Sequence, residues 1–225
     1  MVSAWRQRCP NSGFVQSSTA ASDARYRLFV KHNRAFAALS RHLRQHPELF
    51  RPWKGTMYRV TTLKYRDPAE ILLGEGSYLN GGRWNAIGSF RAVYGSTDDV
   101  VALAESKANA LYANLPYPFR DPRLVVAAEV SLSRVIDLTA PETLKALALT
   151  EEELAREDWR KVQEQGAESF TQALGRAAFI AKAEGLLARS ARVKGGINIV
   201  YFPQNKARGS DVRLWQPRQL APDES

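Results

Sequence analysis

The sequence predicts an α+β domain with a mixed, largely antiparallel sheet and flanking helices. Strand-like and helix-like segments mix along the chain without the regular strand–helix–strand order of a parallel sheet. No internal repeat is visible. The chain has 225 residues, 44% of them hydrophobic, which suits one medium-sized domain with a substantial core and room for an appendage.

Six short runs predict the strands of this sheet. Each is apolar or rich in β-branched and aromatic residues. The last two runs are separated by Lys-Gly-Gly, which indicates a turn between them. The runs cover residues 57–62, 91–96, 123–132, 134–139, 186–193 and 197–202.

Capping residues predict three helices beyond residue 90. Thr-Asp-Asp at 97–99 is expected to cap a helix that continues to Pro116. Thr150 and Glu153 form a capping-box pattern that opens an acidic helix. A further helix is expected over residues 168–185, with the glycine that ends this range at its C-terminus.

The leading segment predicts a basic amphipathic helix behind a tail. Residues 1–21 are rich in Ser, Ala, Asn and Gly, and a helix is expected from Ser22 to His46, ended by Pro47. Two interpretations stand: the helix packs its apolar stripe on the main domain, or it docks on an acidic partner, on nucleic acid or on a second copy of the chain. The stripe consists of Phe29, Phe36, Leu39 and Leu43.

The charge is unevenly distributed. The formal net charge is +9, of which residues 1–54 carry +8, and these residues also contain all three histidines. Residues 55–225 are nearly neutral and have neither histidine nor cysteine. This composition excludes a histidine-based triad, a thiolate nucleophile and a zinc site of the usual ligands there. Chemistry in this part must rely on Arg, Glu, Asp, Ser, Tyr and Lys.

Several classes of protein are disfavoured by what the sequence lacks. No apolar run is long enough to span a bilayer, and the first ten residues lack the apolar core of a secretory signal. The single cysteine, Cys9, cannot form an internal disulfide, which indicates a reducing compartment. We therefore expect a soluble cytoplasmic protein with no membrane contact.

Glu105 is the first candidate for a functional side chain. It shares a helix with Val101, Ala108 and Leu111, at spacings that place it on or beside the apolar stripe. A carboxylate in such a position must be paired or must face a cavity, because an unpaired buried charge is costly. The alternatives are an ion pair with an internal arginine and a functional role.

Arg83 and Ser190 are weaker candidates on their own. Arg83 follows two glycines, which let a backbone approach a ligand, and its guanidinium suits phosphate oxygens, yet most such loops are turns. Ser190 lies beside two arginines at the end of an apolar run, where a strand-end serine is the commoner case. No Gly-x-Ser-x-Gly elbow surrounds it, so a hydrolase nucleophile is disfavoured.

Together these residues form a recognisable set. The segments "MYRV", "GGRWNAIGSFRAVYGS", "ALAES", "VIDLT" and "GLLARSARVKGGINIVYF" resemble the RES domain family, which is named for its Arg, Glu and Ser. The resemblance runs from about Met57 to Pro203. Members of this family are typically NAD-degrading toxins of bacterial toxin–antitoxin pairs. The resemblance divides the chain into a basic segment, 1–54, and a RES-like NAD-binding catalytic domain, 55–225.

The resemblance also implies roles for individual residues, in a fold similar to that of ADP-ribosyltransferases. Arg83 would bind the pyrophosphate of NAD, and Tyr94 would pack against the nicotinamide or its ribose. Glu105 would bind the ribose hydroxyls and stabilise the positive charge that develops as nicotinamide leaves. Ser190 would hold the ribose or the amide. The expected catalytic residues are Arg83, Glu105 and Ser190, and the expected NAD-binding residues are Arg59, Arg83, Tyr94, Glu105 and Ser190.

The resemblance implies an enzyme that depletes NAD. NAD is its substrate, no metal takes part, and water or inorganic phosphate is the acceptor. Two alternatives remain: transfer of the ADP-ribosyl group to a cellular target, and a non-catalytic module that binds nucleic acid or a partner. The near-neutral charge of residues 55–225 counts against the second. The implied partner is a helix-turn-helix antitoxin. A homo-oligomer is an additional expectation, and direct contact with nucleic acid is not expected.

Overall fold

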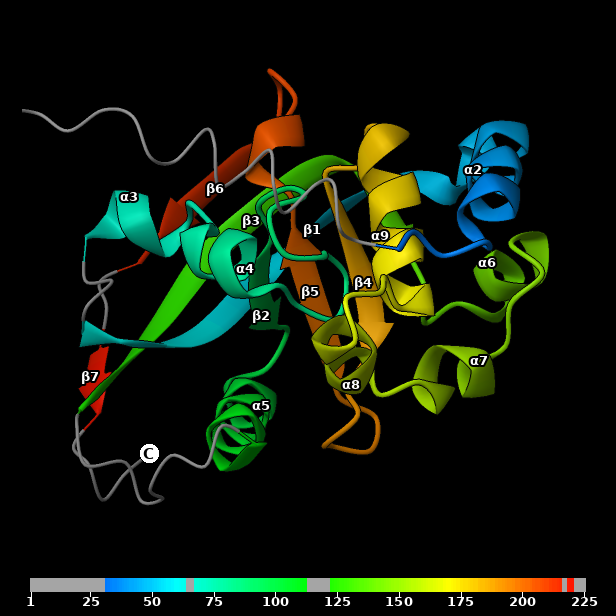
Figure 1. The fold of residues 1–225 in the computed structure, drawn as a ribbon. Coiled ribbons are helices and arrows are strands. Elements are labelled where there is room, and N and C mark those ends of the chain that lie inside the picture. Colours follow the sequence, from blue (N-terminus) through cyan, green and yellow to red (C-terminus); the bar gives the residue numbers. More distant parts are fainter. Residues whose placement is uncertain (1–30, 64–66, 113–121, 216–217, 221–225) are drawn as a thin grey trace, which may run out of the picture.

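The computed structural model describes residues 31–63, 67–112, 122–215 and 218–220, and within them it forms a mixed sheet with flanking helices (Figure 1). Every strand pair is antiparallel except β3–β4, which confirms the predicted sheet class. In these residues the strands are β1 (Phe50–Thr62), β2 (Val93–Ser96), β3 (Arg123–Asp137), β4 (Gly185–Arg189), β5 (Ile197–Tyr201), β6 (Asp211–Leu214) and β7 (Arg218–Leu220).

The strand pairings close the sheet on itself. The order β1-β2-β5-β4-β3 returns to β1, because β1 also pairs with β3 along most of its length. This ladder runs from Phe50 opposite Ile136 to Thr62 opposite Arg123. β6 and β7 extend from β3 outside the ring.

Two strand predictions are corrected by the long β1–β3 ladder. The first strand begins at Phe50, not at Met57, so the boundary predicted between residues 54 and 55 falls inside β1. The runs 123–132 and 134–139 belong to one strand, β3, which ends at Asp137. Ser133 between them does not break the strand, because its backbone N–H and its hydroxyl both contact Ser210 Oγ, at 3.1 Å each.

The helices of the described residues are mostly short, and several of them begin at a side-chain cap. The predicted capping box of Thr150 and Glu153 is present, and Ser169 and Gln172 form a second one. The last helix is shorter than predicted, because it ends at Ile180 and Gly185 is already the first residue of β4. The helices are α2 (Phe36–Gln45), α3 (Pro68–Ile71), α4 (Glu75–Asn80), α5 (Asp99–Tyr112), α6 (Pro141–Ala146), α7 (Glu151–Arg156), α8 (Trp159–Glu164) and α9 (Phe170–Ile180).

The basic helix of the leading segment is part of the core. α2 packs beside α9 (Figure 1), and Leu39 and Leu43 are only 3% and 1% exposed. Phe36 packs against the same core cluster. The hypothesis that this stripe contacts a partner or a second copy is therefore wrong for these three residues, since the apolar face is already covered. Phe29 and the predicted helix start at Ser22 lie outside the described residues. The predicted helix is wrong over residues 31–35, which are not helical, and α2 begins only at Phe36.

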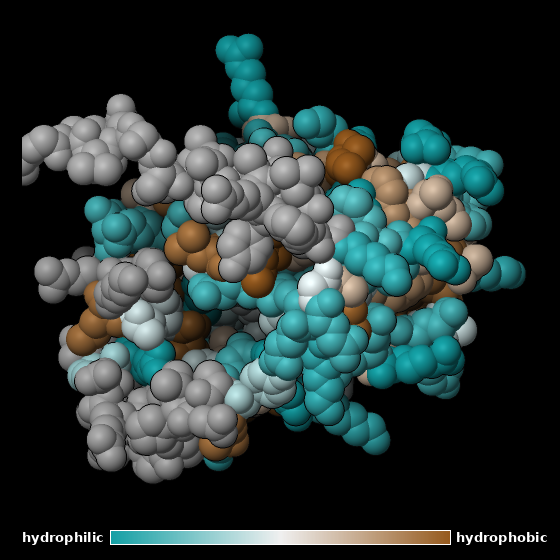
Figure 2. All heavy atoms as spheres, in the orientation of Figure 1, coloured by the Kyte–Doolittle hydropathy of each residue, from teal (hydrophilic) through white to brown (hydrophobic). Residues whose placement is uncertain are grey.

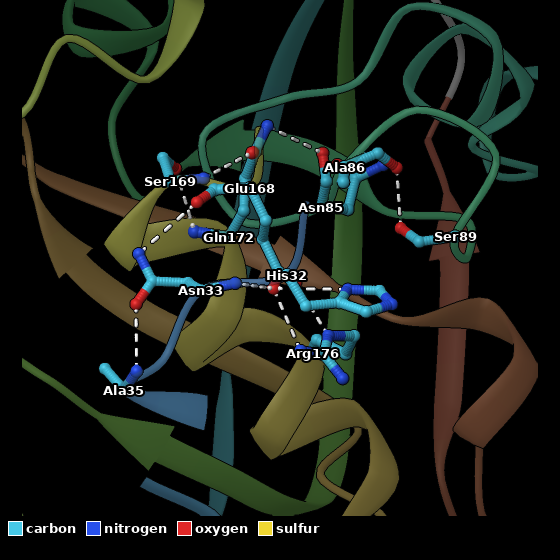
Figure 3. Close-up of polar contacts among 10 residues, drawn as sticks. All are labelled: His32, Asn33, Ala35, Asn85, Ala86, Ser89, Glu168, Ser169, Gln172 and Arg176. Atoms are coloured by element: carbon cyan, nitrogen blue, oxygen red, sulfur yellow. Dashed lines mark hydrogen bonds and ion pairs between the residues drawn. The ribbon is translucent and has the colours of Figure 1, made fainter. Parts of the chain in front are cut away.

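A buried polar network joins the leading segment to α9 (Figure 3). The Glu168 carboxylate accepts hydrogen bonds from Asn33 N at 3.0 Å and from Arg176 Nε and Nη2 at 2.6 and 2.9 Å. The Arg176 guanidinium in turn lies 3.5 Å from the centre of the Phe36 ring.

None of the helices in the described ranges has the length and apolar composition needed to cross a membrane.

Candidate functional site

A cavity of about 740 Å³ lies between the sheet, α5 and α8. Figure 2 shows the corresponding hollow in the surface, with hydrophilic side chains gathered over α8. The volume falls within the range of about 300–1,000 Å³ that is typical of ligand sites. Four of the five candidate residues line it, namely Arg59, Arg83, Tyr94 and Glu105, and Ser190 contacts Glu105 directly.

Glu105 is held by one oxygen and open at the other. Its Oε1 accepts hydrogen bonds from Ser190 Oγ at 2.7 Å and from Asn198 Nδ2 at 2.8 Å. Within the described part of the chain, Oε2 has no hydrogen-bond partner, and no arginine forms an ion pair with the carboxylate. The carboxylate is thus fixed in orientation while one oxygen remains available to a ligand in the cavity.

Asn198 is a site residue that the sequence reasoning missed. It lies opposite Ser96 in the β2–β5 ladder, and its Oδ1 accepts a hydrogen bond from Ser96 Oγ at 2.8 Å. This contact orients the amide so that Nδ2 points at Glu105. The available signal was a polar side chain inside the apolar run "INIVYF".

Ser190 is saturated by its neighbours. Its hydroxyl donates to Glu105 and accepts hydrogen bonds from the backbone N–H groups of Arg192 at 3.0 Å and Val193 at 3.1 Å. Because its proton points to Glu105 and its lone pairs are used by the turn, the hydroxyl acts on the carboxylate rather than as a nucleophile.

Arg83 brings a half-buried positive charge to the same cavity. Its Nη2 donates to Leu154 O at 2.7 Å, and its guanidinium lies 5.4 Å from the centre of the Trp84 ring. Burial lowers the pKa of Arg83 below its usual value, and the charge of Glu105 partly offsets this effect. The guanidinium still carries its charge, because an arginine does not lose its proton at physiological pH.

Tyr94 anchors the loop that carries Arg83. Its hydroxyl donates to Asn85 Oδ1 at 2.7 Å and accepts from Trp84 N at 2.9 Å, and burial raises the pKa of Tyr94. A Cβ at Gly82 would lie only 2.4 Å from the Tyr94 hydroxyl. Glycine is therefore required at this position so that the tyrosine can pack on the loop. Arg59 adds a further tie, since its Nη1 donates to Tyr94 O at 2.8 Å.

Helix α9 supports the other side of this loop. Gln172 Nε2 donates to Gly82 O at 3.0 Å, and a Cβ at Gly175 would lie 1.8 Å from Trp84 O. The close approach of α9 to the loop depends on this glycine. The loop is thus fixed by a strand tyrosine on one side and a buried helix on the other, which sets the position of Arg83.

The fold and the cavity define an α+β protein with a preorganised carboxylate and an arginine in one cleft. Residues 56–223 match the RES domain family, so the chain belongs to this family, and the resemblance described above is confirmed. The chain is 29% identical to NAD(+) phosphorylase MbcT from Mycobacterium tuberculosis over 173 residues, 76% of this chain and 84% of that protein. The match to the protein of the same name from Mycobacterium bovis has the same extent.

A solved structure has a similar fold. In the crystal structure of the M. tuberculosis MbcT–MbcA toxin–antitoxin complex, the matching chain is 25% identical with a TM-score of 0.63. The similarity covers 83% of this chain and 93% of that chain.

Proposed function

We propose that this protein is a toxin that depletes NAD by cleaving the bond between nicotinamide and ribose, with inorganic phosphate or water as acceptor. The observation that carries this proposal is the Glu105 carboxylate, which is fixed through Oε1 and open to the cavity through Oε2. The names of the relatives, NAD(+) phosphorylase and toxin–antitoxin complex, support the same activity.

The proposed reaction needs no proton donor for the leaving group. When the C–N bond breaks, its electron pair returns to the pyridinium ring, so nicotinamide leaves as a neutral molecule. Positive charge develops on the ribose at the same time, and Glu105 Oε2 stabilises it and binds a ribose hydroxyl. Arg83 contacts the pyrophosphate, the Tyr94 ring contacts the nicotinamide ribose, and Ser190 acts by holding Glu105.

The acceptor follows from the same chemistry. A phosphate dianion can form the new C–O bond without first losing a proton, whereas water must lose one. The cavity lining offers carboxylates for that proton, so the choice of phosphate is supported by the name of the relatives, NAD(+) phosphorylase, rather than by the lining. Transfer to a protein target is the second candidate, because the proposed likeness to the ADP-ribosyltransferase fold also suits that reaction.

An antitoxin is the proposed partner. A solved structure with a similar fold is a toxin–antitoxin complex, which supports a neutralising protein for this chain as well. We propose that this antitoxin carries a helix-turn-helix DNA-binding domain.

Product analysis tests the proposed activity. The purified protein is incubated with NAD, with and without inorganic phosphate, and the products are separated and identified. Release of nicotinamide with formation of phosphorylated ADP-ribose is expected in phosphate. Persistence of NAD in both buffers refutes the proposal, and ADP-ribose attached to protein supports the second candidate instead.

A further inference from the structure

Arg160 lies at the α8 side of the cavity and packs against two aromatic rings. Its guanidinium carbon is 4.4 Å from the centre of the Tyr112 ring and 4.4 Å from that of Trp159. Nη2 donates a hydrogen bond to Asn109 Oδ1. Among the described residues, the other N–H groups of the guanidinium have no hydrogen-bond partner. All four side chains line the cavity.

Helix α5 sets the distance between this cluster and the candidate catalytic carboxylate. Glu105, Asn109 and Tyr112 follow one another at spacings of four and three residues, which places them on one face of the helix. From Glu105 to Tyr112 the helix rises about 10 Å. Arg160 is held by Asn109 and Tyr112, so its position lies one to two turns along α5 from Glu105.

The chemistry of the cluster suits a nucleotide. A guanidinium with unused N–H groups binds phosphate oxygens through paired hydrogen bonds. Aromatic rings stack on nucleobases. Tyr112 is 42% exposed and Trp159 is half-buried, so both rings have surface available to a planar base.

We propose that Arg160, Tyr112 and Trp159 bind the ADP half of NAD, with a phosphate on the free edge of Arg160 and adenine against the aromatic rings. This inference rests on the proposed function, in which the nicotinamide ribose lies at Glu105. NAD then follows α5, with the reacting ribose at Glu105, the pyrophosphate near Asn109 and the adenosine near Tyr112. Arg83 contacts the pyrophosphate from the Glu105 side and Arg160 contacts it from the adenosine side.

The partial burial of the Arg160 guanidinium supports the proposed contact with phosphate. It lowers the pKa of Arg160 below its usual value, while the neighbouring Tyr112, Asp158 and Glu105 act in the opposite direction. A desolvated guanidinium binds an anion more strongly than an exposed one, because fewer water molecules compete for its N–H groups.

ADP is the probe, because it contains the proposed half of the substrate and no reacting bond. Its binding is measured by calorimetry, and its inhibition of nicotinamide release is measured against NAD. Arg160→Ala is expected to weaken ADP binding and raise the KM for NAD by about 10- to 100-fold, with kcat within about 3-fold of wild type. Arg160→Lys keeps the charge without the planar guanidinium. Its ADP affinity and its KM for NAD are expected to lie between those of wild type and Arg160→Ala.

Lys161→Ala is the matched control. Lys161 is the next residue of α8, it is exposed, and it does not line the cavity. Lys161→Ala removes the same positive charge as Arg160→Ala, but from an exposed position outside the cavity. ADP binding is therefore expected to change by no more than about 2-fold. An equal loss in both variants would overturn the subsite, because general electrostatics would then explain the effect.

The failures of the two proposals are distinguishable. A wild-type protein that leaves NAD intact refutes the proposed function. A wild-type protein that consumes NAD but does not bind ADP, or an Arg160→Ala variant with unchanged ADP affinity, overturns the subsite alone. An Arg160→Ala variant that loses kcat at saturating NAD also overturns it, because Arg160 would then only hold α5 and α8 together.

Discussion

Glu105 and Glu168 are both carboxylates that accept hydrogen bonds from distant parts of the chain, but they are bonded in opposite ways. Both oxygens of Glu168 are occupied by Arg176 and Asn33, and its side chain is 1% exposed. Glu105 receives two hydrogen bonds on one oxygen and faces a cavity with the other. Because both of its oxygens are paired, Glu168 stabilises the fold. Glu105 is paired through one oxygen only, which leaves the other available to a ligand.

Substitution of Glu105 is expected to have the largest effect. Glu105→Gln keeps the shape of the side chain but removes the charge that, in the proposed reaction, stabilises the reacting ribose. Nicotinamide release is expected to fall by about 10²–10³-fold with little change in Tm. Turnover close to wild type would show that the open carboxylate is not the catalytic group.

Substitution of Glu168 is expected to affect stability instead. Glu168→Ala leaves Arg176 and Asn33 N without their partner in a buried position, and the free energy of unfolding is expected to fall by about 3 kcal/mol. Urea unfolding measures this change. The kcat of the folded fraction is expected to remain near wild type, and a selective loss of kcat with normal stability would contradict the comparison.

A substitution of Asn198 tests whether the hydrogen bonds to Glu105 Oε1 support the proposed function of Glu105 Oε2. Asn198→Ala removes one of the two donors to Glu105 Oε1, and nicotinamide release is expected to fall by about 10-fold. Ser96→Ala is the matched control, since Ser96 orients Asn198 without touching Glu105, and a smaller loss is expected. An equal or larger loss in Ser96→Ala would place the effect in the β2–β5 ladder rather than in the carboxylate.

Tyr94 is expected to give the smallest effect. Tyr94→Phe removes the hydroxyl that ties Trp84 to Asn85, and the free energy of unfolding is expected to fall by about 1 kcal/mol near pH 7.

The pH dependence of this variant has a definite sign. Because the folded-state pKa of Tyr94 is raised, its contribution is complete below the unfolded value of about 10 and is lost as pH rises above it. The stability difference between wild type and Tyr94→Phe is therefore expected to narrow above pH 10 in urea unfolding at a series of pH values. A difference that widens would contradict the assigned direction.

Much of the fold was predictable because its signals are local. The Thr150–Glu153 capping box, the start of α5, the strand that contains Tyr94 and the strand that ends just before Ser190 depend on residues within a few positions of one another. The helix end expected at Gly185 was wrong because a glycine that opens a strand and one that ends a helix look alike in sequence. β1 was predicted too short because its first half pairs only with β3, which is distant in the chain.

By itself, the sequence determined the fold class and the family, because these follow from short motifs with specific spacing. The same motifs proposed the candidate site residues Arg83, Tyr94, Glu105 and Ser190. Only the tertiary structure decided which oxygen of Glu105 is held, that Asn198 holds it, and that Arg160 packs on Tyr112. It also decided that the stripe of α2 belongs to the core. The physical reason is that these contacts join residues far apart in sequence, such as Glu105 and Asn198 at 93 positions, and no local pattern specifies which distant side chain completes a hydrogen bond or covers an apolar face.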